Sequence, residues 1–312
     1  MLLVLLQLNC LQPDSRHDND QNSATIKFCT FSRTLAYSGQ GGCIYVSSIS
    51  INNDISDCLF VNCSSYSHGG AIFLESGGIL IQRVCSTLCN TDSGYGQFGY
   101  LSVKDSNRNN VLNFTSVSYS ANKYWATPRY YPTYHLSGIQ KVQNTNSSYN
   151  SNYHHSGIGI DNPNTYYSSF CTFFSNHAIQ YDCIIFIAGT GSRIVENTNV
   201  VNNTQDTTNR GTIRIYNNAI ISMIKSIFAH NNHFLFHAPD GSLTIIDCIV
   251  CHLSGSIGNV IIGSNNEMRC DKETLVIKHY HSFLCEQPKQ IGTSTYVSTT
   301  KVFVLFSYIS YL

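Results

Sequence analysis

A repeat of about 27 to 29 residues runs through most of this chain and limits the folds that it can adopt. The segment Asp57–Leu74 holds one copy. An apolar run with Cys58 and Phe60 leads into an Asn-Cys-Ser turn, and Gly69-Gly70 then opens a second apolar run. A fixed period of about 20 to 50 residues indicates a solenoid or an array of similar units, which bury their apolar faces against one another.

Copies of both halves of this unit recur from Thr25 to about Val250. The first half recurs as Phe28-Cys29-Thr30-Phe31 and Phe170-Cys171-Thr172-Phe173, and the second as Gly41-Gly42-Cys43-Ile44. A third apolar run, such as Ile79-Leu80-Ile81, lies between them, and a weak copy is expected near Val142–Ser148. Each period therefore contains three short runs with strand character and no helical pattern.

We predict an all-β fold, a right-handed parallel β-helix (solenoid) with about 27–29 residues and three short strands per rung, where a rung is one turn of the solenoid. Inward side chains are expected to stack into ladders, and Asn residues at the turns to stack as amide ladders. Glycine suits the tight bends. We expect Cys29, Cys58, Cys85, Cys171 and Cys248 to occupy equivalent buried positions, with few disulfides between rungs.

The two ends of the chain differ from the repeat region. Residues 1–20 begin with the apolar MLLVLLQLNC, which resembles a short signal peptide but lacks a preceding Lys or Arg, so an apolar strand is the alternative. We assign 21–265 to the β-helix and 266–290 to a terminal rung or cap, stapled by Cys270 and Cys285. Residues 291–312 form a Ser/Thr linker and an apolar tail, interpreted as a terminal strand or as the start of a truncated membrane span.

The charge composition argues against nucleic-acid binding, because 18 basic residues balance 18 acidic ones and no basic patch stands out. The segment Trp125–His155 interrupts the repeat with Pro128, Pro132 and many tyrosines. We expect Tyr124–Tyr134 to protrude as an exposed loop. Exposed aromatic rings offer rigid contact area, so a binding loop is one interpretation and a structural bulge the other. The residues of the expected binding loop are Trp125, Tyr130, Tyr131 and Tyr134.

The tetrapeptides Gly69-Gly70-Ala71-Ile72 and Phe173-Phe174-Ser175-Asn176 resemble the GGAI and FxxN repeats of polymorphic outer membrane proteins, known as chlamydial surface adhesins. The chain also resembles Cys-rich β-helix surface proteins of parasitic protozoa. The resemblance covers roughly residues 25–265. It implies a β-helix at the cell surface, but no segment resembles the autotransporter barrel of the bacterial members.

Several local patterns could be mistaken for reactive sites. Cys248-Ile249-Val250-Cys251-His252 matches the haem-attachment pattern, but Cys248 falls on the repeat and is interpreted as core. His230, His233 and His237 have the wrong strand spacing for a zinc site, and Cys85 and Cys89 have no matching second pair. We therefore predict no catalytic residue, no metal and no cofactor. The enzyme alternative, a polysaccharide lyase or hydrolase, would use Asp182, Glu196, Asp206 and Arg214, although these acids show no paired signature.

Four sequons place N-glycan acceptors at Asn62, Asn113, Asn146 and Asn202, if the chain is exported. We predict a non-catalytic, extracellular or cell-surface β-helix with an adhesive or structural role. The expected partners are host-cell or matrix glycans or proteins, and membrane attachment would involve the apolar C-terminal segment.

Overall fold

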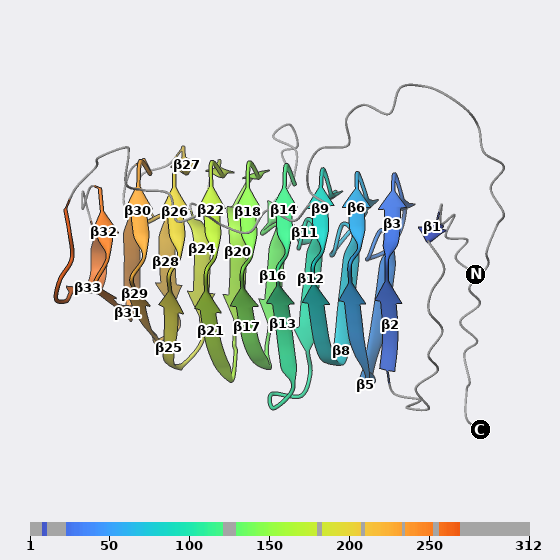
Figure 1. Ribbon diagram of the computed structural model, residues 1–312, viewed down its shortest axis with the longest axis horizontal. Coiled ribbons are helices and arrows are strands. Elements are labelled where there is room, and N and C mark those ends of the chain that lie inside the picture. Colours follow the sequence, from blue (N-terminus) through green and yellow to red (C-terminus); the bar gives the residue numbers. More distant parts are fainter. Residues whose placement is uncertain are drawn as a thin grey trace.

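The structure, a computed structural model, describes residues 8–10, 23–120, 129–179, 183–206, 210–232, 235–251 and 256–268. These residues form strands, turns and bends and no helix. The strands stack along one axis as a β-solenoid, which confirms the all-β parallel β-helix fold (Figure 1). No helix long and apolar enough to cross a membrane is found in the described part of the chain.

One side of the solenoid is a ten-stranded sheet to which each rung contributes one short strand. All of its pairings are parallel except that of β1, which lies within the predicted leader and runs antiparallel to β3. The strands, in spatial order, are β1 (Leu8–Cys10), β3 (Cys29–Ser32), β6 (Leu59–Val61), β9 (Cys85–Thr87), β14 (Ser116–Ser118), β18 (Asn146–Ser148), β22 (Thr172–Phe174), β26 (Asn199–Val201), β30 (Ile227–Ala229) and β32 (Ile249–Val250).

The remaining walls belong to a 17-stranded sheet, to which most rungs contribute two strands or one long strand. Its strands are β2 (Ser23–Lys27), β5 (Ile44–Ser56), β8 (Ile72–Gln82), β11 (Gly94–Tyr95), β12 (Gly99–Val103), β13 (Asn109–Asn113), β15 (Arg129–Tyr130), β16 (Thr133–Leu136), β17 (Ile139–Gln143), β20 (His155–Asp161), β21 (Thr165–Ser169), β24 (Cys183–Ala188), β25 (Gly191–Glu196), β28 (Ile213–Tyr216), β29 (Ala219–Ile224), β31 (Phe236–Ile246) and β33 (Ile257–Ile262). Two three-stranded sheets cover one corner of the solenoid. The first consists of β4 (Leu35–Ala36), β7 (Ser64–Ser65) and β10 (Asn90–Thr91). The second consists of β19 (Ser151–Asn152), β23 (His177–Ala178) and β27 (Thr204–Gln205).

Sharp bends lie on both sides of each strand of the ten-stranded sheet from β3 to β30. Asp57 and Asn62 on either side of β6, and Phe170 and Ser175 on either side of β22, all have a positive φ. This left-handed backbone costs a non-glycine residue roughly 1–2 kcal/mol. Stacking of the same bend on successive rungs offsets that cost, because each strained residue still joins the ladder of backbone hydrogen bonds, as Asn62 does to the Thr87 carbonyl at 2.9 Å.

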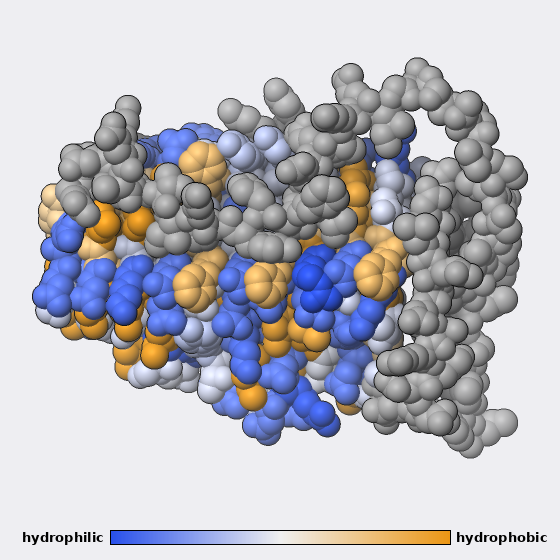
Figure 2. Space-filling view, viewed as in Figure 1, coloured by the Kyte–Doolittle hydropathy of each residue, from blue (hydrophilic) through white to orange (hydrophobic). Residues whose placement is uncertain are grey.

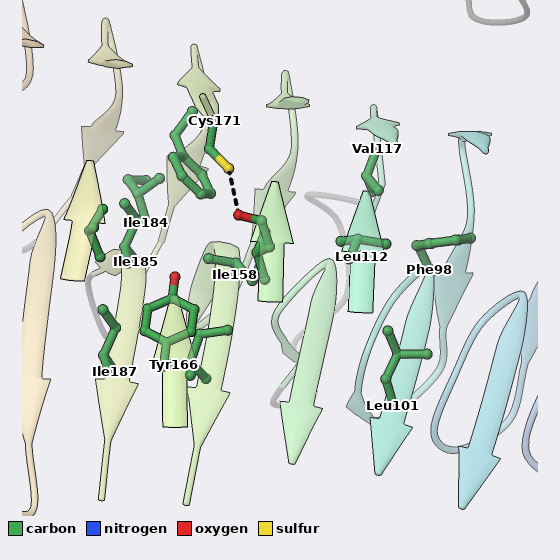
Figure 3. Close-up of a cluster of buried hydrophobic side chains, with 14 of the residues drawn as sticks. Phe98, Leu101, Leu112, Val117, Ile158, Tyr166, Cys171, Ile184, Ile185 and Ile187 are labelled. Atoms are coloured by element: carbon green, nitrogen blue, oxygen red, sulfur yellow. Dashed lines mark hydrogen bonds between the residues drawn. The ribbon is translucent and has the colours of Figure 1, made fainter. Parts of the chain in front are cut away.

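Most of the core is one continuous cluster that runs along the inside of the solenoid, and a small second cluster contains Ile227, Ala229 and Cys251. Figure 3 shows Leu112, Ile158 and Tyr166 pointing inward from different strands. Inward residues alternate with outward ones along each strand, as the pleat requires. Figure 2 shows that hydrophilic and hydrophobic side chains are mixed along the described surface of the face in view.

The cysteine ladder follows the prediction except at Cys85. Cys29, Cys58, Cys171 and Cys248 directly follow a left-handed residue and are buried. Cys85 pairs instead with Leu59 and Ser116, one position further along, and it is disulfide-bonded, as is Cys251. The prediction is wrong here because Val84, not Cys85, follows the bend at Arg83. Rung lengths vary, so a count of residues does not give the register.

Amide stacking at the turns is confirmed. Asn150, Asn176, Asn203 and Asn231 occupy the same position after the second bend on four successive rungs, and we call them the amide ladder. The Asn176 Oδ1 accepts from the backbone N and the Nδ2 of Asn150, both at 3.0 Å. Its Nδ2 donates to the Ser147 carbonyl at 2.8 Å and to the Asn203 Oδ1 at 3.1 Å. The ladder therefore satisfies its own buried polar groups.

The predicted weak rung is confirmed as β17 and β18, which pair with the rungs on both sides. The strands of the solenoid extend from Ser23 to Ile262. The predicted cap beyond Met268, including Cys270 and Cys285, and the apolar tail lie outside the described residues.

Candidate functional site

An outward-facing column of aromatic side chains runs along the 17-stranded sheet, one residue from each rung. The register aligns Tyr45 with Phe73, Phe73 with Tyr100, and Tyr100 with Tyr134. It continues through Gly159, Phe186, Arg214 and His237. Each of these residues lies between inward-facing neighbours, such as Ile185 and Ile187 beside Phe186, so the pleat points them to the outer face.

The rings of this column stack on one another. The ring centroids of Tyr45 and Phe73 lie 5.3 Å apart with an interplanar angle of 12°, and those of Phe73 and Tyr100 lie 4.9 Å apart at 9°. Because each ring covers the face of its neighbour, the column can present only ring edges and Tyr hydroxyl groups, and its exposure varies along the rod. Tyr45 is 58% exposed, whereas Phe73 is 3% exposed. Such a strip combines apolar contact area with hydrogen-bonding groups.

A ring from outside the register closes the gap in this column. Gly159 has no side chain, and a Cβ atom there would lie 2.6 Å from the Tyr131 ring. The Tyr131 ring centroid is 5.2 Å from that of Tyr134 and 5.8 Å from that of Phe186. Tyr131 has a φ of 48° at a bend where Gly69 stands on another rung. This strained bend places the ring over Gly159, so the stack is continuous.

We call the set Tyr45, Phe73, Tyr100, Tyr134, Tyr131 and Phe186 the aromatic row. Desolvation by burial raises the pKa of Tyr100 to about 12. It also raises the pKa of Tyr134, whose hydroxyl donates to the Asp161 Oδ2 at 2.8 Å. These hydroxyls stay protonated at neutral pH and can donate hydrogen bonds.

A cationic cluster follows the aromatic row on the same sheet. The Arg214 guanidinium carbon lies 5.9 Å from the Phe186 ring centroid and 4.8 Å from that of Tyr216, distances that permit cation–π attraction. Burial lowers the pKa of His237, and Arg214 and Arg210 lower it further. We call Arg210, Arg214, His154, His155 and His237 the cationic cluster, since these groups interact electrostatically.

Two polar atoms of this cluster are buried without a hydrogen-bond partner, Nε of Arg214 and Nδ1 of His237. The His237 side chain is only 9% exposed. A buried donor without a partner is costly, roughly 1–3 kcal/mol. Other buried atoms, such as Arg193 Nε and His135 Nε2, also lack a partner, but Arg214 and His237 are aligned neighbours in the outward column, so one ligand there could supply both missing partners.

The predicted protruding tyrosine loop is wrong for the residues that the structure describes. Tyr130 lies in β15 and Tyr134 in β16, and Tyr131 and Tyr134 are 3% and 7% exposed. Tyr130 stacks on Tyr95 at 4.7 Å. The rung tolerates Pro132, which has no N–H, because Pro132 lies at the bend between β15 and β16, outside the strands. Trp125 lies outside the described residues.

The sequons separate into two pairs. Asn62 and Asn202 are exposed at left-handed bends of the rod surface. Asn113 and Asn146 lie inside strands β13 and β18, and the Asn146 Oδ1 is buried. An acceptor amide must be reachable from solvent, so the folded surface offers Asn62 and Asn202 as acceptor sites.

The residues considered for an enzyme make separate contacts. The Tyr167 hydroxyl donates to the Glu196 Oε1, and the Asp206 Oδ2 lies 3.4 Å from the His177 Nε2. Arg214 belongs to the cationic cluster, and Asp182 lies outside the described residues. The structure thus does not bring Glu196, Asp206 and Arg214 into one hydrogen-bonded group.

The described residues of the haem-attachment and zinc patterns also lie in separate environments. Cys248 points into the core, where its Sγ donates to the Met223 carbonyl at 3.4 Å. His230 is exposed at a bend after β30, whereas His237 lies in β31; His233 and His252 are not described. Among the described residues, no three His, Cys, Asp or Glu side chains are grouped so that they could hold a metal ion.

Three buried thiols form a separate group at the turn. The Thr34 Oγ1 lies 2.7 Å from the Cys43 Sγ, and the side chains of Cys43 and Cys89 hydrogen-bond to Cys63. Burial raises the pKa values of the Cys43 and Cys89 thiols, and their hydrogen bonds lower that of Cys63. The Cys63 and Cys89 thiols also contact carbonyl oxygens of the preceding rung at 3.6 and 3.8 Å, which indicates a packing role.

Sequence reasoning missed the aromatic row and the cationic cluster. The sequence pattern that could have revealed them is the middle residue of the apolar run in the second half of each repeat, as in Ile44-Tyr45-Val46, Ile72-Phe73-Leu74 and Ile213-Arg214-Ile215. Alternation along a strand places this middle residue outside. Only the parallel register shows that the middle residues stand above one another.

No protein-family model matches the chain, and comparison with curated proteins and with solved structures finds no match. The function is therefore argued from the residues of the chain alone.

Proposed function

We propose that this chain is a non-catalytic, extracellular or cell-surface β-solenoid that binds its partner along the aromatic row. Its role is adhesive or structural, and its partner is a host-cell or matrix glycan or protein. The observation that carries the proposal is the continuous stack of outward rings from Tyr45 to Phe186. Rigid aromatic rings give large contact area at low entropic cost.

The geometry of the row favours an extended ligand. Rungs repeat at roughly 4.8 Å, the spacing of paired strands, so the row offers similar contacts at regular intervals along the rod. A linear glycan or an extended peptide can repeat one contact at each interval. The balanced charge of the chain, 18 basic and 18 acidic residues, gives no general attraction for nucleic acid.

The test is a glycan-array screen of the purified protein, with a reducing-sugar assay on each glycan that binds. We expect binding without release of reducing ends. Tyr45→Ala should weaken binding roughly tenfold, because it removes about 1–1.5 kcal/mol of ring contact. Tyr119→Ala is the matched control, since Tyr119 is 41% exposed and stacks on Tyr149 at a different bend.

Two results would contradict the proposal. Release of reducing ends by the wild-type protein would favour the polysaccharide-active enzyme instead. Equal loss of binding in Tyr45→Ala and Tyr119→Ala would show that the row has no special role.

A further inference from the structure

The cationic cluster continues the aromatic row in the same register. Phe186 on β24, Arg214 on β28 and His237 on β31 are consecutive outward residues. A ligand that lies along the ring edges would therefore meet Arg214 and His237 directly after Phe186. The row changes from neutral rings to cations at this point.

Arg210 and Arg214 carry the positive charge of the cluster at neutral pH, because burial lowers the pKa values of its histidines. Arg210, Arg214 and His154 all act on His155, and each of them lowers its pKa after the larger effect of burial. On His237, Arg214 and Arg210 act in the same direction, and Asp240 is the carboxylate that opposes them. Of the strands packed against β31, β28 contributes Arg214 and Tyr216, and β29 and β33 contribute no titratable side chain. Charge complementarity thus favours an anionic group.

The hydrogen-bonding capacity left in the cluster also fits an anion. Nε of Arg214 is a donor, and Nδ1 of His237 becomes one when the ring is protonated. The rings of Phe186 and Tyr216 lie beside the guanidinium group at 5.9 and 4.8 Å, which limits the directions in which it can turn. A planar guanidinium binds carboxylate or sulfate oxygens with paired hydrogen bonds, which are stronger than those between neutral groups.

We propose that the cationic cluster binds the carboxylate or sulfate group of an acidic glycan whose sugar rings lie along the aromatic row. This inference rests on the proposed binding function and names the ligand class. Arg214 supplies the charge and the paired donors, and His237 supplies a further donor.

The anion also changes the protonation of the histidines. An anion beside His237 favours the protonated ring, so its pKa rises on binding and a proton is taken up. Affinity for the acidic glycan therefore increases as the pH falls from 7.5 toward 5.5, while affinity for a neutral glycan stays nearly constant.

Calorimetric titration of the full chain tests the proposal with three oligosaccharides of equal length, one carboxylated, one sulfated and one neutral. The variants are Arg214→Gln, Arg214→Lys and, as control, Arg108→Gln, whose side chain is exposed beside Asp105 on another part of the rod. We expect the acidic oligosaccharide to bind at least tenfold more tightly than the neutral one. Arg214→Gln should remove that preference, Arg214→Lys should keep part of it, and Arg108→Gln should retain it. The acidic oligosaccharide that binds more tightly, carboxylated or sulfated, identifies the anionic group that the cluster prefers.

Urea unfolding of each variant shows whether it folds. If Arg214→Gln does not fold, His237→Asn provides a second test of the preference for the acidic oligosaccharide. Equal binding of neutral and acidic oligosaccharides by the wild-type protein would overturn the anion site and leave the proposed function standing. Failure of all three oligosaccharides to bind would overturn both. An unchanged preference in Arg214→Gln would also overturn the assignment.

Discussion

The amide ladder and the aromatic row are both columns of similar side chains stacked rung on rung, but they differ in how completely their polar groups are bonded. The side chain of Asn176 makes four hydrogen bonds, three to its neighbours in the ladder and one to the Ser147 carbonyl. The aromatic row leads instead to Arg214 and His237, each of which has a buried nitrogen atom without a partner. A column that satisfies itself supports the fold, whereas an outward column with unmet donors has capacity for a ligand.

The largest predicted effect concerns the amide ladder. Asn176→Ala removes partners from the Asn150 N–H, the Ser147 carbonyl and the Asn203 Oδ1 inside the rod. We expect a loss of about 3–5 kcal/mol in the free energy of unfolding, because several buried groups lose a bond at once. Urea unfolding measures this loss.

The neighbouring exposed Asn202 provides the matched control. Its Nδ2 donates one hydrogen bond, to the Ser175 Oγ at 2.8 Å, so Asn202→Ala should cost less than about 1 kcal/mol. If the two variants were equally stable, the amide ladder would not support the fold as described.

Acid should destabilise the folded chain through His135, which is buried in the core. Its Nδ1 lies 3.1 Å from the Asn110 Oδ1. The Asn110 Nδ2 donates to the Leu101 carbonyl, which fixes the orientation of the amide, so the Asn110 Oδ1 accepts a hydrogen bond from the His135 Nδ1–H. Burial lowers the pKa of His135 from 6.5 to about 3. The unfolded chain therefore binds the proton first, and stability falls as the pH drops below about 6.5.

We expect the wild-type protein to lose roughly 2–3 kcal/mol of unfolding free energy between pH 7 and pH 4.5 from this residue. Urea unfolding at both pH values measures it. His154 and His155 act in the same direction, since burial lowers their pKa values too. His135→Gln should thus reduce the pH dependence without abolishing it, and an unchanged dependence would show that His135 is not the main buried base.

The contact between Tyr131 and Gly159 should give a smaller effect that tests the continuity of the aromatic row. Gly159→Ala places a Cβ atom against the Tyr131 ring, so we expect a cost of about 2 kcal/mol from overpacking. Tyr131→Gly removes the ring and relaxes the left-handed bend. The double variant should therefore be less destabilised than the sum of the single ones, and strict additivity in urea unfolding would show that the ring does not fill this space.

The smallest energetic effect concerns the sequons. If the chain is secreted from a eukaryotic host, peptide mass spectrometry should find glycans at Asn62 and Asn202, which are exposed, and higher occupancy there than at Asn146 in β18. Replacing Asn62 by Gln should change the unfolding free energy by less than about 0.5 kcal/mol. Preferential occupancy of Asn146 would contradict the register of that strand.

The sequence predicted the features that depend on the repeat itself. Gly69-Gly70 marks a bend where a Cβ on Gly70 would lie 2.0 Å from the Gln97 carbonyl oxygen, and stacked Asn residues at the turns form the expected ladder. Such features are local, because one rung contains the residues that cause them.

Features that depend on the exact register could not be predicted in the same way. Cys85 falls on the period but stands one position beyond the buried column, because the preceding rung is shorter. Tyr131 and Tyr134 were expected in a loop because Pro128 and Pro132 lie among the tyrosines of this segment, yet they belong to a rung whose strands pair with those of the neighbouring rungs. The aromatic row joins residues from five rungs, and no single rung reveals it.

The most direct test of the division between the two columns measures stability and binding together on one matched pair of variants. Asn176→Ala and Tyr100→Ala each shorten one side chain in the middle of a column, and urea unfolding and glycan titration are run on both. We predict that Asn176→Ala loses several kcal/mol of stability while its folded fraction binds with unchanged affinity. Tyr100→Ala should lose roughly tenfold in affinity with the smaller loss of stability. The reverse pattern, with binding lost in Asn176→Ala and retained in Tyr100→Ala, would contradict the assignment of binding to the aromatic row.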